Sequence, residues 1–158
     1  MKNTKIIFIL IFSLLASCGF KPINEKNSSL IYFNDIVVSG DKRISYNLKN
    51  NILLISDDSS KNNYDAEIKL TKQKKTKIKD ISGKVTRYNV NLSALLKLTN
   101  NKNKKEIQKT FSKNVDYDVA KIHSNTINNE NNATKNLTQQ ISTDIINFIS
   151  LAMRNKWY

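Results

Sequence analysis

The chain has 158 residues, of which 26 are Lys or Arg and 13 are Asp or Glu, so its formal net charge is +13. It contains one cysteine, one histidine, three glycines and one proline. A single cysteine excludes an intrachain disulfide, so a stable fold has to come from packing, and the Cys/His spacing of a structural zinc site is absent as well.

The first segment, residues 1–17, has the composition of a secretory signal. Lys2 and Lys5 form a positive start, residues 6–15 are apolar apart from Ser13, and small residues follow. The apolar run is too short for a stable membrane-spanning helix. We therefore predict a signal peptide rather than an anchor helix.

Cys18 follows directly, and Leu15-Ala16-Ser17-Cys18 resembles the lipobox of bacterial lipoproteins, in which the cysteine is lipidated and becomes the new N-terminus. The alternative is a plain signal peptide that happens to contain a cysteine. At ~0.8 kcal/mol per buried CH₂, several acyl chains would hold the protein on a membrane. Because Gly19 rather than Asp follows Cys18, lipoprotein sorting favours the periplasmic face of the outer membrane. We predict a lipidated Cys18 and tether at 18–29 and one domain at 30–158.

The first part of this domain is predicted to be a strand, a turn and a helix. Residues 30–38 are β-prone and apolar on both faces, which indicates an interior or an irregular strand. Residues 39–41 form a turn in which Asp41 is a good helix N-cap. Residues 41–56 then repeat apolar side chains at helical spacing, namely Ile44, Leu48, Ile52 and Ile55.

Three extended segments follow. Residues 64–70 and 88–98 alternate apolar and polar side chains, and residues 107–119 contribute apolar side chains to a further strand. From residue 72 to 79 the alternation ends and both faces are polar, and residues 81–84 permit a turn. Since the linkers are short, we predict an antiparallel meander.

The end of the chain predicts a long helix from about residue 124 to 154, with an apolar stripe of Ile127, Leu137, Ile141, Ile145, Phe148 and Ala152. Each helix then has one apolar stripe and each later strand one apolar face. The predicted fold class is therefore α+β: a two-layer sandwich with two helices on one face of a mainly antiparallel four-stranded sheet, in the order β-α-β-β-β-α.

A family resemblance appears at the predicted mature start. Cys18-Gly19-Phe20-Lys21-Pro22 is similar to the start Cys-Gly-Phe-x-Pro-Leu of the LPS-assembly lipoprotein family LptE, with Ile23 where leucine is usual. The order of the predicted elements is also similar to that of the family. The chain departs from it in its richness in lysine and asparagine, including the asparagines at the start of the last helix. The resemblance implies a plug inside the outer-membrane β-barrel LptD, which supports assembly of that barrel and delivery of lipopolysaccharide, with direct binding of lipopolysaccharide.

No catalytic or metal motif accompanies this resemblance. His123 is the single histidine and has no nucleophile motif nearby, and Asp57 and Asp58 are expected to belong to a loop. No phosphate-binding glycine loop and no EF-hand pattern occur. We therefore expect a protein that is not an enzyme and has no metal and no cofactor. As an exported protein it is not expected to bind nucleic acid.

The one basic cluster is the lysine run of residues 72–79, which comprises Lys72, Lys74, Lys75, Lys77 and Lys79. On an extended strand the even-numbered and odd-numbered lysines face opposite ways. One interpretation is a solvated hairpin arm whose lysines reflect genome composition. The other is a surface that contacts lipid A phosphates or acidic residues of a barrel lumen, since lysine suits phosphate as a mobile charge. The rival function is an independent lipoprotein that binds anionic lipid or glycan without a barrel.

Overall fold

The computed structural model describes residues 31–154. The elements in chain order are β1 (Tyr32–Ser39), α2 (Lys42–Leu53), β2 (Asn63–Lys79), β3 (Val85–Asn100), β4 (Glu106–Asp118) and α3 (His123–Arg154). The predicted signal peptide, Cys18 and the tether lie outside the described residues.

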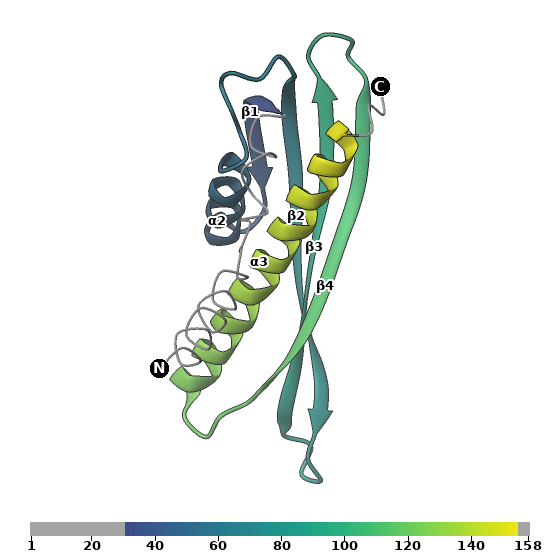
Figure 1. Cartoon of the computed structure of the whole chain (residues 1–158). Coiled ribbons are helices and arrows are strands. Elements are labelled where there is room, and N and C mark those ends of the chain that lie inside the picture. Colours follow the sequence, from purple (N-terminus) through teal and green to yellow (C-terminus); the bar gives the residue numbers. More distant parts are fainter. Residues whose placement is uncertain (1–30, 155–158) are drawn as a thin grey trace, which may run out of the picture.

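The four strands form one sheet in the order β1-β2-β3-β4. Strand β1 runs parallel to β2, while β2–β3 and β3–β4 are antiparallel hairpins. Helices α2 and α3 contact each other and the same face of the sheet (Figure 1). The predicted fold class, element order and meander are therefore confirmed, in a sheet that is mixed because helix α2 is the crossover between two parallel strands.

Strand β1 is an irregular edge strand, so the interior alternative was wrong and the irregular one correct. Its register with β2 shifts between Phe33 and Asp35. Phe33 and Ile36 are buried, although their spacing of three would put them on opposite faces of a regular strand, whereas Val37 is 52% exposed. The irregularity explains why the sequence is apolar on both faces.

Helix α2 begins as predicted at Asp41, whose side chain accepts hydrogen bonds from the backbone N–H groups of Arg43 and Ile44 at 3.0 and 3.2 Å. It ends at Leu53, three residues before the predicted end at 56. The preceding Gly40 has a φ of +123°, and a Cβ there would lie 2.7 Å from the carbonyl oxygen of Leu70. This turn therefore needs glycine for both conformation and space.

The core lies between the helices and the alternating side chains of the later strands. Every second side chain is buried from residue 64 to 70 of β2 and from 90 to 98 of β3, which confirms the predicted alternation except at Tyr88, which is half-buried. The buried set is Tyr64, Ala66, Ile68, Leu70, Val90, Leu92, Ala94, Leu96 and Leu98, and strand β4 adds Phe111 and Tyr117. The opposite face of the sheet carries mainly polar side chains, with Val37 and Leu95 as exposed apolar ones, so the helix layer covers one face only.

Helix α3 begins at His123, which confirms the predicted element through its asparagine-rich first turns. The predicted stripe is wrong at Ile127, which is 47% exposed, because the inward face at that level is occupied by its neighbour Thr126. Further along, buried threonines and a serine alternate with the predicted Leu137, Ile141 and Ile145. Each hydroxyl donates to the carbonyl four residues earlier, as in Thr138 to Thr134 at 2.8 Å, so their burial leaves no hydroxyl unpaired there.

Beyond the helix layer and the end of β4, β2 and β3 continue as a two-stranded hairpin, visible at the bottom of Figure 1. We call residues 72–88 the arm, which comprises this hairpin and its base beside α3 and β4. Its turn is closed by Asp80, whose side chain accepts hydrogen bonds from the backbone N–H groups of Ser82 and Lys84, and Gly83 adopts a φ of +82°. None of the helices within residues 31–154 combines the length and apolarity needed to span a membrane.

Candidate anion-binding surface

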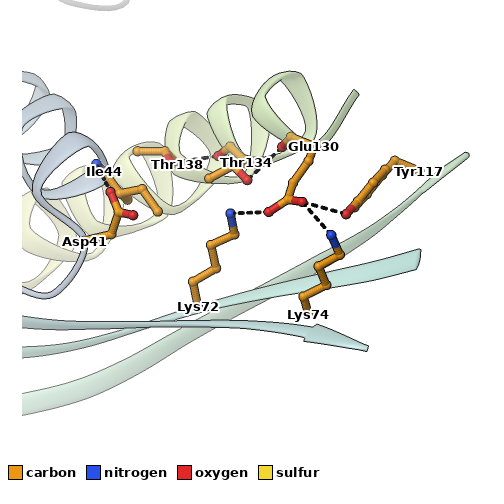
Figure 2. Close-up of polar contacts among 8 residues, drawn as sticks. All are labelled: Asp41, Ile44, Lys72, Lys74, Tyr117, Glu130, Thr134 and Thr138. Atoms are coloured by element: carbon orange, nitrogen blue, oxygen red, sulfur yellow. Dashed lines mark hydrogen bonds and ion pairs between the residues drawn. The ribbon is translucent and has the colours of Figure 1, made fainter. Parts of the chain in front are cut away.

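The structure separates the five predicted lysines into two sets. Lys72 and Lys74 point toward helix α3, where both meet the carboxylate of Glu130 (Figure 2). Lys75 and Lys77 line a shallow hollow of about 430 Å³ on the opposite face, together with amide side chains such as Asn89. The predicted division between even-numbered and odd-numbered lysines is therefore confirmed for these four residues. It follows from the alternation of side chains along a strand.

On the helix side, Glu130 is the centre of a polar cluster. Lys72 Nζ lies 2.7 Å from Glu130 Oε1, and Lys74 Nζ lies 2.8 Å from Oε2. The hydroxyl of Tyr117 donates to the same Oε2 at 2.8 Å. Strands β2 and β4 thus bring three donors to one carboxylate on α3. We call Lys72, Lys74, Tyr117 and Glu130 the Glu130 cluster.

Aromatic rings complete the surroundings of Lys74. Its ammonium group lies 4.2 Å from the ring centroid of Tyr88 and 5.6 Å from that of Tyr117. The two rings lie 5.7 Å apart, tilted by 32°. A cation over an aromatic face gains electrostatic attraction. The rings therefore help to hold this ammonium beside the Glu130 carboxylate.

The cluster shifts the pKa of its members. Partial burial by itself would raise the pKa of Glu130, but the hydrogen bonds from Lys72, Lys74 and Tyr117 outweigh it and lower the pKa to about 2. The hydrogen bond to Glu130 raises the pKa of Lys74. Burial raises the pKa of Tyr117, which stays a neutral donor at neutral pH. The cluster is therefore an anion held by two cations and a hydroxyl.

Within the arm, the lysines that make weak or no ion pairs lie on the outer face and at the tip. Lys77 approaches Asp116 only to 3.9 Å, with its side chain 54% exposed. Lys75, Lys79 and Lys84 make no ion pair with any residue that the structure describes. Two apolar side chains accompany them.

Those apolar side chains are Ile78, which is 45% exposed, and Ile81, which projects fully into solvent at the turn. Isoleucine at the exposed end of a hairpin has no partner in the fold to explain it. The arm tip therefore combines exposed apolar and cationic side chains.

The other residues considered from the sequence have structural surroundings. His123 is the exposed first residue of α3. Asp57 accepts hydrogen bonds from the backbone and hydroxyl of Ser59 at 2.8 and 2.7 Å, which lowers its pKa and shapes the expected loop. Within residues 31–154, no group of three or more His, Cys, Asp and Glu side chains is placed to hold a metal ion.

Sequence reasoning did not find the role of Glu130 or of the Tyr117 hydroxyl. Glu130 lies 58 and 56 positions from its two lysine partners, so no local pattern joins them. One signal was available, because Glu130 and Asp144 are the only acidic residues of α3. Each binds a lysine of the sheet, since Asp144 lies 2.9 Å from Lys113.

No protein-family model and no curated protein matches the sequence. Solved structures do match the fold. The crystal structure of rare lipoprotein B from Shewanella oneidensis matches with a TM-score of 0.62 at 12% identity, over 79% of this chain and 100% of that one. The crystal structure of a protein from Caulobacter crescentus CB15 that is classed as a lipoprotein matches with a TM-score of 0.56 at 15% identity, over 82% and 94% of the two chains. The resemblance to LptE is thus confirmed at the level of the fold, which is that of rare lipoprotein B.

Proposed function

We propose that this chain is an outer-membrane lipoprotein that acts as LptE-type proteins do, as a plug of an LptD-like β-barrel that supports barrel assembly and the delivery of lipopolysaccharide. The observation that carries the proposal is the match to the whole length of rare lipoprotein B, whose fold this chain reproduces at 12% identity. The start Cys18-Gly19-Phe20-Lys21-Pro22 supports it independently, because it is a feature of the sequence and not of the fold.

The anchor in this proposal is Cys18. Acyl chains on this residue would place the domain on the periplasmic face of the outer membrane, at the end of a short polar tether. Metabolic labelling with palmitate checks this step, since the wild type takes up label and the Cys18→Ser variant does not. Label on the variant would contradict a lipoprotein.

The uncovered face of the sheet suits a barrel partner. It carries amide and hydroxyl side chains in rows across the strands, with Asn89 donating to Asp116 at 2.6 Å and Asn91 donating to Ser112 at 3.2 Å. The lumen of an outer-membrane barrel is polar. A sheet face lined by amides, hydroxyls and the lysines Lys75 and Lys77 fits a polar lumen that offers acceptors to these cations, which supports the role of a plug.

The arm suits lipopolysaccharide, which has phosphates beside acyl chains. Lys75, Lys79 and Lys84 offer mobile positive charge to phosphate, and Ile78 and Ile81 offer apolar contact beside them. The rival function, a lipoprotein that binds anionic lipid or glycan alone, would use the same arm. The arm therefore supports the ligand class, and a barrel partner has to be tested separately.

Co-purification from native membranes tests the plug. A tagged full chain extracted in neutral detergent is expected to come out with a large β-barrel protein in equal amount. The Cys18→Ser variant is the matched control. If the protein is a plug, this variant should still co-purify with the barrel although it has no lipid anchor, because the contact lies in the folded domain. Recovery of the lipoprotein alone in both preparations would reject the plug and leave the independent lipoprotein.

A further inference from the structure

Three hydrogen-bond donors of the sheet converge on a single point above it. Lys72 Nζ, Lys74 Nζ and the Tyr117 hydroxyl all lie within 2.8 Å of a carboxylate oxygen of Glu130 (Figure 2). Two ammonium groups and one hydroxyl are also the donors that hold phosphate groups. The arrangement is thus an anion-binding site in which the bound carboxylate, that of Glu130, belongs to the protein itself.

Glu130 neutralises the charge of this site only in part. One carboxylate brings a single negative charge to two ammonium groups, whereas a phosphate monoester carries about −1.5 to −2 and has three acceptor oxygens. A phosphate would therefore satisfy the three donors more fully than the carboxylate does. The aromatic rings beside Lys74 hold its ammonium in place for either anion.

The part of α3 that carries Glu130 is lightly held. From residue 123 to 132, Thr126 is the one buried side chain among those described, and the apolar core begins with Ala133. Besides Glu130, this segment is fixed by polar contacts, such as the amide of Asn129 donating to the carbonyl of Asp118 at 3.0 Å. Since no apolar side chain of residues 123–132 is buried, the Glu130 side chain can leave its three donors without exposing apolar core.

We propose that Lys72, Lys74 and Tyr117 form a binding site for a phosphate monoester, and that Glu130 fills this site in the unliganded protein as an internal competitor. The proposal deepens the proposed function, on which its choice of an anionic ligand rests. The proposed site lies on the side of the arm that faces α3. It is formed by Tyr117 as well as by the lysines, and Glu130 competes for it. The ligand has to displace the Glu130 side chain, so binding is coupled to loss of its contacts with Lys72, Lys74 and Tyr117.

The test is a calorimetric titration of the full mature chain in neutral detergent with two probes, inorganic phosphate and short-chain phosphatidic acid. Glu130→Gln removes the competing charge and is expected to tighten binding by about fivefold or more, as loss of a unit charge some 4 Å away implies. Asp144→Asn is the matched control, since it removes the other acidic side chain of α3 and should bind like the wild type. Adding Lys74→Met to Glu130→Gln should abolish the gain.

Equal or weaker binding by Glu130→Gln than by the wild type would overturn the proposal, as would an equal gain in Asp144→Asn. Comparison of the two probes identifies the source of the phosphate. Phosphatidic acid that binds more tightly than inorganic phosphate indicates a lipid headgroup, and the reverse order indicates free phosphate. Both orders support the site if the gain in Glu130→Gln is present.

A measurement on the wild type makes the test independent of how well the variants fold. Carboxyl NMR of glutamate-labelled protein reads the pKa of Glu130, which is about 2 in the unliganded state. Saturating inorganic phosphate should move it toward the ordinary value of about 4.3, because the displaced carboxylate loses its donors. An unchanged value with bound phosphate would overturn the proposal. A failed barrel co-purification would leave these results unaffected, so the two proposals can fail separately.

Discussion

Helix α3 is held to the sheet by two different kinds of interaction along its length. From Ala133 onward its inward side chains are buried in the core, and Phe148 meets Phe111 edge to face with ring centroids 5.8 Å apart. Before Ala133 the contacts are polar, and the Glu130 cluster is the centre of them. Apolar burial depends little on charge or salt, whereas an ion-paired cluster responds to both. The difference identifies the end of the helix at which an anionic ligand or a change of pH can act.

The largest effect is expected where the apolar region begins. Leu92 is 1% exposed and pairs with Lys72 across the sheet, so it lies at the boundary between the two regions. Leu92→Asp buries an unpaired carboxylate and should cost several kcal/mol, enough to unfold a domain of ordinary stability. Asn91→Asp, one residue away on the polar face, should cost well under ~1 kcal/mol. If chemical denaturation gives equal losses in the free energy of unfolding for both variants, the two faces of β3 do not differ in burial.

The same substitution at two points of α3 tests the comparison directly. Ile145 is fully buried and Ile127 is 47% exposed. Ile145→Ala should lower the free energy of unfolding by about 2–5 kcal/mol, because it removes apolar contacts and leaves a cavity. Ile127→Ala should change it by less than about 0.5 kcal/mol. A large loss at Ile127 in urea titrations would show that the first turns are held by apolar burial after all.

The polar region should contribute less, and in a pH-dependent manner. Glu130→Gln should cost about 1–2 kcal/mol at pH 7, in the range of charge-assisted hydrogen bonds and ion pairs. Since the folded-state pKa of Glu130 is lowered to about 2, its contribution is present above the ordinary glutamate pKa and is lost as pH falls from about 5 to about 2. Thermal unfolding of wild type and variant should therefore converge in this window. Parallel curves would assign the acid sensitivity to other carboxylates.

The smallest effect on stability is expected at the arm tip. Replacing Lys75, Lys79 and Lys84 with serine should leave the free energy of unfolding within about 0.5 kcal/mol, because exposed charges contribute little. It should weaken lipopolysaccharide binding and flatten its salt dependence, as charges beyond ~10 Å are screened at 0.1 M salt.

The matched control for this variant is replacement of Lys61, Lys102 and Lys105, three exposed lysines at the opposite end of the sheet. It removes the same charge from a place where no ligand is proposed. Titrations at two salt concentrations separate the two variants. If both variants lose the same affinity for lipopolysaccharide, the arm contributes only general positive charge. Its lysines would then reflect genome composition, as the first interpretation of the sequence holds.

The periodicity of apolar side chains, together with turn and capping residues, was enough to predict the fold class and most of the core. The alternation in β2 and β3, the N-cap at Asp41 and the turn at Gly83 are local features that act within a few residues. The sequence failed where neighbours in space override local pattern. It placed Ile127 in the apolar stripe, and it allowed β1 to be interior, although an irregular edge strand accounts for the same residues.

By itself, then, the sequence determined the elements, the faces that pack together and the presence of a basic arm, because side-chain period and turn chemistry are properties of short stretches. Only the tertiary structure decided which lysines are neutralised and which are not. Lys72 and Lys74 are paired because α3 crosses the sheet at a level that brings Glu130 to them, while Lys75 and Lys79 lie where no described acidic side chain reaches. The strength of an ion pair depends on distance and burial, which are fixed only when segments more than 50 residues apart are folded together.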